Sequence, residues 1–299
     1  MQLKKTYTVG VILAIFGVVL FSSKAILVKL AYEYNIDSVT LLLLRMGFAL
    51  PFYAVIAIWK KPKSPKEIKK KDYLGLFLFG FLGYYLASYF DFVGLQYIKA
   101  GLERIILFIY PTFVIILSFV FFKKKITKAQ FMAILITYIG VLITFWNEIG
   151  VGGESVYLGG GFILLSALTY AGYLVGSGWL IPKFGAVVFT AYAMLIATFC
   201  ILVHYSFVGD FQIFNYETEV YFLGLAMAIL ATVIPSFLVS AAIERLGAST
   251  FSIFGSLGPI ATIIMAYFFL EEQVSLIQIL GMFVVIGGIS FVTKRKSRV

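Results

Sequence analysis

The chain has 299 residues, of which 62% are hydrophobic and only 13% are charged, whereas water-soluble domains carry about 25% charged residues. Its net charge of +10 comes from basic residues in short stretches between apolar runs, a distribution that argues against a nucleic-acid surface. One cysteine, Cys200, and one histidine, His204, cannot form a disulfide framework or a structural zinc site, which needs about four Cys or His ligands. No phosphate-binding GxxxxGK[ST] loop is present. We therefore expect an integral membrane protein without a metal, a cofactor or an ATP-driven motor of that kind.

Ten apolar segments follow one another along the chain, each long enough for a helix of about 20 residues to cross a bilayer. Backbone polar groups cannot stay unpaired in lipid, and the runs show no two-residue alternation, so we expect helices rather than a barrel. The first segment resembles a cleavable signal peptide, but its apolar run resumes after Ala25 and favours an uncleaved helix. The sequence thus predicts an all-α integral membrane protein with helices at 8–31, 39–59, 73–96, 100–122, 129–146, 157–180, 185–207, 218–241, 248–270 and 275–293.

The loops between these segments alternate in charge. Of the 24 Lys and Arg residues, 19 lie at the chain ends or in every second loop, and seven of these are lysines within residues 60–71. The intervening loops hold acidic residues instead, among them Glu33, Asp37 and Glu217. Because Lys- and Arg-rich loops stay in the cytoplasm, we expect both termini to be cytoplasmic and the protein to lie in the cytoplasmic (inner) membrane.

An internal repeat divides the chain. Residues 95–145 align without gaps on residues 243–293, at a constant offset of 148 residues. Matched positions include Ala100 with Ala248, Pro111 with Pro259, Gln130 with Gln278, and Gly140 with Gly288. We expect two five-helix repeats, 8–147 and 157–294. Since five is odd, the second repeat would enter the membrane from the opposite side, as in many secondary transporters. Duplication without transport is the alternative.

Several motifs carry a resemblance to a known family. They are Gly94–Leu95–Gln96–Tyr97–Ile98 running into Ala100, Tyr110–Pro111–Thr112, and Leu270–Glu271–Glu272–Gln273 leading into Gln278, Gly281, Gly287 and Gly288. With these motifs the chain resembles the drug/metabolite transporter superfamily with two EamA-type domains, over nearly its whole length. The resemblance implies ten helices, cytoplasmic termini, and export or exchange of small organic metabolites such as amino acids.

Five ionisable residues fall inside the predicted spans of the first repeat: Lys24, Arg45, Asp91, Glu103 and Arg104. Such residues cost about 2.5–3.5 kcal/mol each on insertion scales and are functional candidates by default. Counting 1.5 Å per residue from the helix ends places all five in the outer half of the membrane, at depths that let them meet. They form either a structural ion network or the outer gate of a substrate path. In the second reading, Asp91 and Glu103 are candidate proton sites.

Hydroxyl groups line helix faces in the second repeat. Ser166, Tyr170, Tyr173 and Ser177 follow helical spacing on one face of 157–180, and Thr232, Ser236 and Ser240 do so on 218–241. In the first repeat, Tyr84, Ser88 and Asp91 share a predicted face. Hydroxyls also hold membrane helices together, so packing is the alternative to a cavity wall. The candidate path or gate residues are Lys24, Arg45, Tyr84, Asp91, Glu103, Arg104, Tyr170, Tyr173 and Ser177.

The sequence therefore predicts a secondary transporter of small organic metabolites that works by alternating access. Its partners would be a small-molecule substrate and the lipid bilayer, with no nucleic acid. A channel-like or lipid-handling component without coupled transport is the alternative. An enzyme is not expected, because no His, Cys or carboxylate group has catalytic spacing.

Overall fold

The computed structural model describes residues 2–123, 125–144, 154–209, 211–271 and 275–296, and over these ranges it contains helices and no strand. The predicted end of the first repeat at residue 147 lies outside the described residues. The α-helices are α1 Gln2–Tyr32, α2 Ser38–Trp59, α3 Lys70–Gly80, α4 Ala87–Tyr97, α5 Ala100–Leu107, α6 Tyr110–Phe122, α7 Lys128–Thr144, α8 Glu154–Phe184, α9 Ala186–Val208, α10 Thr218–Ala228, α11 Ile234–Leu246, α12 Ala248–Phe254, α13 Leu257–Phe269 and α14 Leu276–Lys296. The all-α prediction is confirmed.

Seven helical stretches in the described ranges are long and apolar enough to cross a membrane. They are Thr6–Tyr32, Ser38–Trp59, Lys70–Tyr97, Ser155–Phe184, Ala186–Val208, Thr218–Leu246 and Ala248–Phe269. Three shorter apolar helices, Tyr110–Phe122, Gln130–Gly140 and Ile279–Gly288, lie within the other predicted segments. The architecture is thus that of a multi-pass membrane protein, and the count of ten crossings stays a prediction.

Four predicted segments are interrupted helices. The segment 73–96 passes from α3 through the π-helix η2 (Phe81–Leu86) into α4, and 218–241 passes from α10 through the π-helix η3 (Ile229–Val233) into α11. Ile229 follows Phe81 by 148 residues, which is the offset of the internal repeat. The segments 100–122 and 248–270 are broken near their midpoints into α5–α6 and α12–α13. A duplicated unit would produce such matched irregularities.

Proline accounts for part of this pattern. Pro111 and Pro235 lie in the first turns of α6 and α11. Backbone N–H groups in the first turn have no acceptor within their own helix, so a proline, which lacks this group, costs the helix no hydrogen bond there. The helix before each proline loses a donor, which favours a break or a wider turn at that point. Single long spans were expected here because the apolar runs continue through the breaks.

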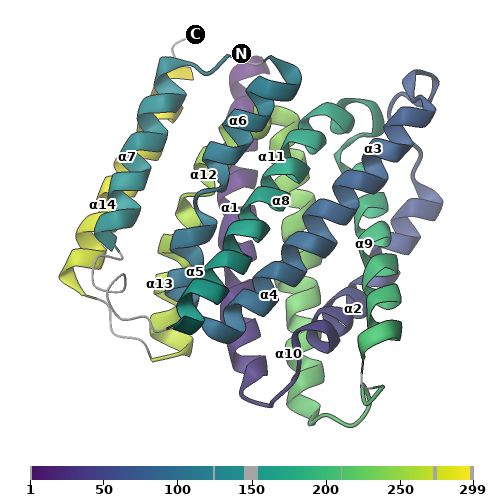
Figure 1. Ribbon diagram of the computed structural model, residues 1–299. Coiled ribbons are helices and arrows are strands. Elements are labelled where there is room, and N and C mark those ends of the chain that lie inside the picture. The colour runs from purple at the N-terminus through teal and green to yellow at the C-terminus, as the bar shows by residue number, and fades with distance from the viewer. Residues whose placement is uncertain (1, 124, 145–153, 210, 272–274, 297–299) are drawn as a thin grey trace.

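The two halves of the chain pack across each other. Helix α1 packs along α11 and α13, while α8 packs along α4 and α6. At the repeat offset of 148 residues, α4 corresponds to α11 and α6 corresponds to α13. The first helix of each half therefore packs against the equivalent pair of helices in the other half. Helices α7 and α14 pack along each other at one edge of the bundle (Figure 1).

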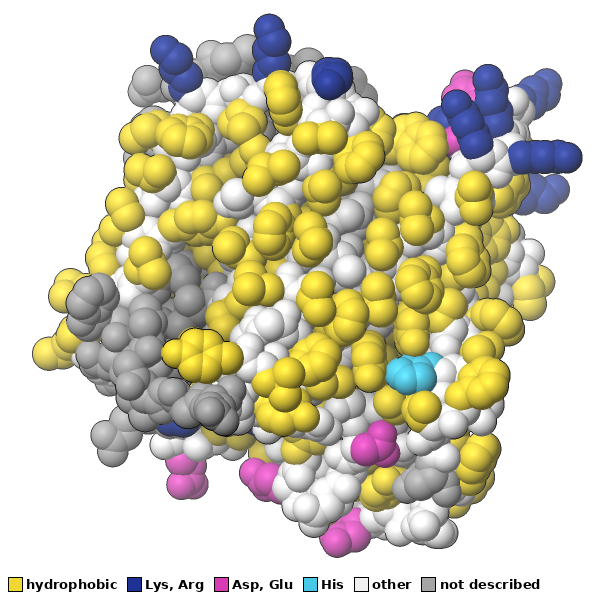
Figure 2. All heavy atoms as spheres, in the orientation of Figure 1, with side chains coloured by type: hydrophobic (Ala, Val, Ile, Leu, Met, Phe, Trp, Pro, Cys, Tyr) yellow, Lys and Arg dark blue, Asp and Glu magenta, His cyan; other side chains and the backbone are white. Residues whose placement is uncertain are grey.

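The surface has a wide apolar band with charged ends. Figure 2 shows hydrophobic side chains across the middle of the molecule, most Lys and Arg at one end, and most Asp and Glu at the other. The basic end is the end at which α1 begins and α14 finishes (Figure 1). We call these the basic end and the acidic end. At the acidic end Asp37 caps α2, because its carboxylate accepts the backbone N–H groups of Val39 and Thr40 at 2.8 and 3.0 Å.

Candidate substrate cavity and buried charge cluster

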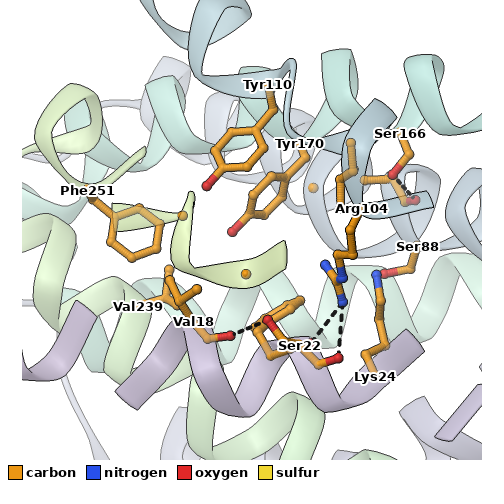
Figure 3. A pocket seen from close by; sticks show the side chains of 16 residues that line it. Val18, Ser22, Lys24, Ser88, Arg104, Tyr110, Ser166, Tyr170, Val239 and Phe251 are labelled. Atoms are coloured by element: carbon orange, nitrogen blue, oxygen red, sulfur yellow. Dashed lines mark hydrogen bonds between the residues drawn. The ribbon is translucent and has the colours of Figure 1, made fainter. Parts of the chain in front are cut away.

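A cavity lies at the centre of the bundle, between elements of both halves (Figure 3). About 70 Å³ of it is open to the centres of water molecules, which is room for several waters. Helices α1, α4, α5, α6, α8, α11, α12 and α13 and the segment η2 contribute to its wall. The lining residues are Val18, Phe21, Ser22, Lys24, Gly83, Ala87, Ser88, Arg104, Leu107, Tyr110, Ser166, Tyr170, Val239, Phe251, Gly255 and Gly258.

Two ion pairs bound this cavity toward the acidic end. The Lys24 Nζ atom lies 2.6 Å from Oδ2 of Asp91, and the Arg104 Nε atom lies 3.1 Å from Oε2 of Glu103. All four side chains are buried. Both cations line the cavity and neither acid does, so the carboxyl groups support the cations from behind. Arg104 is also anchored to α1, because Nη2 donates to the carbonyl oxygen of Ser22 at 3.3 Å.

Asp91 and Glu103, the two acids of this cluster, are both buried. None of the four carboxyl oxygens of Asp91 and Glu103 receives a well-aligned hydrogen bond from a described residue. Two neighbouring carboxylates in a buried site repel each other, and one proton held between them relieves that repulsion. A role of Asp91 and Glu103 as proton sites stays a prediction.

Arg45 of α2 stands beside this cluster without joining it. Its Nε donates to Oγ1 of Thr232 at 2.6 Å, its Nη1 donates to Oγ of Ser88 at 3.3 Å, and its guanidinium carbon lies 5.5 Å from the centre of the Phe92 ring. The Nη2 atom is buried without a hydrogen-bond partner. Arg45 forms no ion pair with any acid in the described ranges. The structure thus brings together four of the five charged residues predicted to meet.

The predicted hydroxyl and tyrosine candidates divide between the cavity and helix packing. Tyr170 lines the cavity, whereas Tyr84, Tyr173 and Ser177 do not. The Tyr173 hydroxyl donates to that of Tyr84 at 2.8 Å, and Ser177 donates to the backbone carbonyl of Tyr173 at 2.7 Å. Tyr84 and Ser88 were predicted to share a helix face, but only Ser88 lines the cavity. Tyr84 lies in η2, whose wider π turn changes the angular position that an α-helix would give it.

Tyr110 and Phe251 bound the cavity toward the basic end, and the sequence did not single them out as site residues. The Tyr110 hydroxyl donates to the carbonyl oxygen of Ser252 at 3.2 Å. Gly255 permits this contact, because a Cβ atom there would stand 1.3 Å from that hydroxyl oxygen. The only available signal was the position of Tyr110 within the Tyr110–Pro111–Thr112 motif.

A second cleft lies beyond Tyr110, at the basic end, with about 380 Å³ open to water centres. It is lined by Ile115, Ser118, Lys125, Ile126, Thr127, Gln130, Leu246, Gly247, Ala248, Ser249 and Thr250. Tyr110 and the Phe251–Ser252 turn of α12 lie between this cleft and the central cavity. Among the residues that the structure describes, no group of three or more His, Cys, Asp or Glu residues could hold a metal ion.

Comparisons with known proteins agree with this architecture. Residues 8–146 and 158–294 each match the EamA-like transporter family. The chain is 32% identical over 290 residues to the uncharacterized transporter YcbK of Bacillus subtilis (strain 168), covering 95% of this chain and 91% of that protein. It is 26% identical over 261 residues to the uncharacterized transporter YdfC of the same organism, covering 86% and 82% of the two chains.

A solved structure described only as "Crystal structure of protein" has the same fold. It superposes with a TM-score of 0.74 at 13% sequence identity, over 97% of this chain and 98% of that one. The two matches to the family cover nearly the whole sequence, one in each half. The chain therefore belongs to the EamA-like transporter family.

Proposed function

We propose that this membrane transporter carries small organic metabolites across the cytoplasmic membrane by alternating access between two inverted five-helix repeats, 8–147 and 157–294. One observation carries the proposal: the central cavity takes its wall from both halves, with buried ion pairs toward one end and the Tyr110–Ser252 contact toward the other. In this proposal the ion cluster is the gate toward the acidic end and the Tyr110–Ser252 contact is the gate toward the basic end. A site between two repeats with a gate on each side is the arrangement that rocking-type secondary transport needs.

The inverted arrangement is supported by the packing of the two halves. Helices α1 and α8 occupy equivalent positions, each against the third and fourth segments of the opposite half. The three shorter apolar helices, together with the seven long ones, support the proposed count of ten crossings. The concentration of Lys and Arg at the end that holds the start of α1 and the end of α14 supports cytoplasmic termini (Figure 2).

The gates differ in chemistry, which suits a cycle driven by a solute or proton gradient. The gate at the basic end is a single hydroxyl–carbonyl bond backed by an aromatic side chain, and such a contact is worth about 0.5–1.5 kcal/mol. The gate at the acidic end contains four buried charges. We infer that Asp91 and Glu103 form a proton site in this outer gate. A proton taken up there would weaken the ion pair between α1 and α4 and the Arg104–Glu103 pair within α5.

Reconstitution tests the proposed function directly. The purified protein is placed in liposomes preloaded with a pool of amino acids, organic acids, amines and nucleosides. Saturable uptake of a labelled solute, stimulated by the same solute on the opposite side, is expected. A channel-like protein would give uptake that does not saturate or show such stimulation, and a lipid-handling protein would give no solute uptake at all.

A further inference from the structure

We propose that the central cavity binds the carboxylate of a small organic anion whose remaining part is apolar or aromatic. The inference rests on the proposed function, since it names the substrate class of the same cavity. Lys24 and Arg104 would receive the carboxylate, and Arg45 would contribute charge from behind the wall. The substrate would be a simple carboxylic acid rather than an amine or a zwitterion.

The first argument is the balance of charge in the membrane core. Three cations, Lys24, Arg45 and Arg104, are at most 7% exposed, while only two acids, Asp91 and Glu103, lie among them in the described structure. The remaining buried acid, Asp72, pairs with Lys183 at the basic end and does not contribute. The core therefore carries one uncompensated positive charge. An unpaired buried charge is strongly destabilising, so an anion that enters the cavity supplies what the protein lacks.

The second argument is the unpartnered donor of Arg45. Its Nη2 atom is buried with no hydrogen-bond partner, although the rest of its guanidinium group is held by Thr232 and Ser88. Ser88 also lines the cavity, so Arg45 is one hydrogen bond from the cavity wall. At that distance, in a medium of low polarity, the positive charge of Arg45 attracts an anion in the cavity strongly.

The third argument is the distribution of groups around the cavity. Lys24 and Arg104 project toward the same end of it (Figure 3), while no Asp or Glu is among the described residues of its lining. A substrate ammonium group would therefore find no carboxylate and would face two cations. The lining also includes Phe21, Tyr170 and Phe251, whose rings suit an apolar or aromatic body, and Phe251 lies at the end away from the two cations (Figure 3). The cavity thus combines a cationic end with aromatic side chains in the rest of its wall.

The acids behind the cations connect this site to the proton site. When a proton binds to the Asp91–Glu103 pair, the cluster loses one negative charge and its excess positive charge increases. An anion in the cavity restores the balance. Proton uptake and carboxylate binding would then strengthen each other, because each reduces the electrostatic cost of the other.

Binding is tested on the whole protein in detergent with matched probes. Acetate, butyrate and phenylacetate supply carboxylates with bodies of increasing size. The neutral 2-phenylacetamide, the cation phenethylamine and the zwitterion phenylalanine supply the same ring with other charges. We expect the carboxylates to raise the thermal midpoint Tm with increasing concentration, with phenylacetate the most effective. The amide, the amine and phenylalanine should bind about tenfold more weakly or not at all.

Two variants with opposite expected effects separate binding from folding. Lys24→Gln combined with Asp91→Asn removes one cavity cation together with its partner, so no further buried charge loses its partner, and phenylacetate affinity should fall about tenfold. Glu103→Gln removes an acid that does not line the cavity and leaves the cluster more positive, so phenylacetate affinity should increase. A purely structural role for the cluster would give no increase in affinity for Glu103→Gln and no selective loss for the double variant.

The outcomes distinguish this inference from the proposed function. The inference fails if none of the three carboxylates changes Tm, or if phenethylamine or phenylalanine binds more tightly than phenylacetate. If the protein then still carries another solute with saturable exchange, transport stands and only the substrate class is wrong. If carboxylates bind as expected but no solute is exchanged in liposomes, the anion site stands and the transport proposal fails.

Discussion

The Lys24 amine lies 2.6 Å from the Asp91 carboxylate inside the helix bundle, where the two residues are 5% and 1% exposed. This pair joins α1 to α4, and both helices contribute residues to the wall of the cavity. A buried ion pair contributes little net stability compared with an apolar pair, but loss of one partner leaves a charge that nothing solvates. A change in the charge of either residue is therefore expected to change the stability of the folded protein.

We predict that Lys24→Met lowers the stability of the protein by about 3–5 kcal/mol, because it leaves Asp91 charged and unpaired. Lys24→Met combined with Asp91→Asn should recover most of that loss. The measurement is thermal unfolding of the single and double variants in the same detergent. A double variant as unstable as the sum of its single variants would mean that the two side chains do not interact.

A second prediction concerns the acid pair. Glu103→Gln and Asp91→Asn should each abolish transport driven by an imposed pH gradient, because neither can hold the exchangeable proton. Folding should survive in Glu103→Gln, since the amide has nearly the shape of the acid. Uptake into liposomes with and without the pH gradient is the measurement, and monodispersity in detergent checks the fold.

Glu33 provides the matched control for this experiment. It is an exposed acid on the acidic side of the fold, so Glu33→Gln should leave the pH dependence unchanged. An unchanged response to the pH gradient in both Asp91→Asn and Glu103→Gln would remove the acid pair from the coupling mechanism.

Much of the architecture was accessible from the sequence for physical reasons. In lipid, a long apolar run can pair its backbone N–H and C=O groups only as a helix. Charged side chains in lipid need partners, so their depths along the predicted helices indicated that Lys24, Asp91, Glu103 and Arg104 would lie close together. Arg45 was predicted to join this cluster but does not, because hydroxyl groups and an aromatic ring, rather than an acid, contact its guanidinium group.

The features that the sequence did not predict arise from contacts between distant segments. The π turn η2 brings Gly83 so close to Tyr173 of α8 that a Cβ atom would lie 2.2 Å from its ring. Tyr110 contacts Ser252 and Gly255, which follow more than a hundred residues later. Helical periodicity describes one helix at a time, so it contains no information on such pairings.

A third prediction addresses the edge pair of α7 and α14. A Cβ atom at Gly140 would stand 2.7 Å from the backbone nitrogen of Val285 and 2.9 Å from the carbonyl oxygen of Gly281. Gly140→Ala should therefore force the two helices apart and lower Tm, despite the higher helix propensity of alanine, which is worth about 1 kcal/mol. Gly161→Ala, where no atom lies within 4 Å, is the control and should leave Tm equal or slightly higher.

The last prediction tests the gate at the basic end. Gly255→Ala should displace the Tyr110 side chain, because the new methyl group and the phenol oxygen cannot occupy the same space. With the gate held open, solute uptake should lose its dependence on solute at the opposite side and become a leak, or fall at least tenfold if α12 shifts as a whole. Gly287→Ala, which meets nothing within 4 Å, should transport normally.

Tyr110→Phe completes this test because it removes only the hydroxyl. Alone, it should loosen the gate by the value of one hydrogen bond, about 0.5–1.5 kcal/mol, and increase leak modestly. Combined with Gly255→Ala, it should recover part of the lost function, since the closest contact of the new methyl group is gone. If the double variant behaves no better than Gly255→Ala alone, the defect arises from α12 itself and Tyr110 is not the gate.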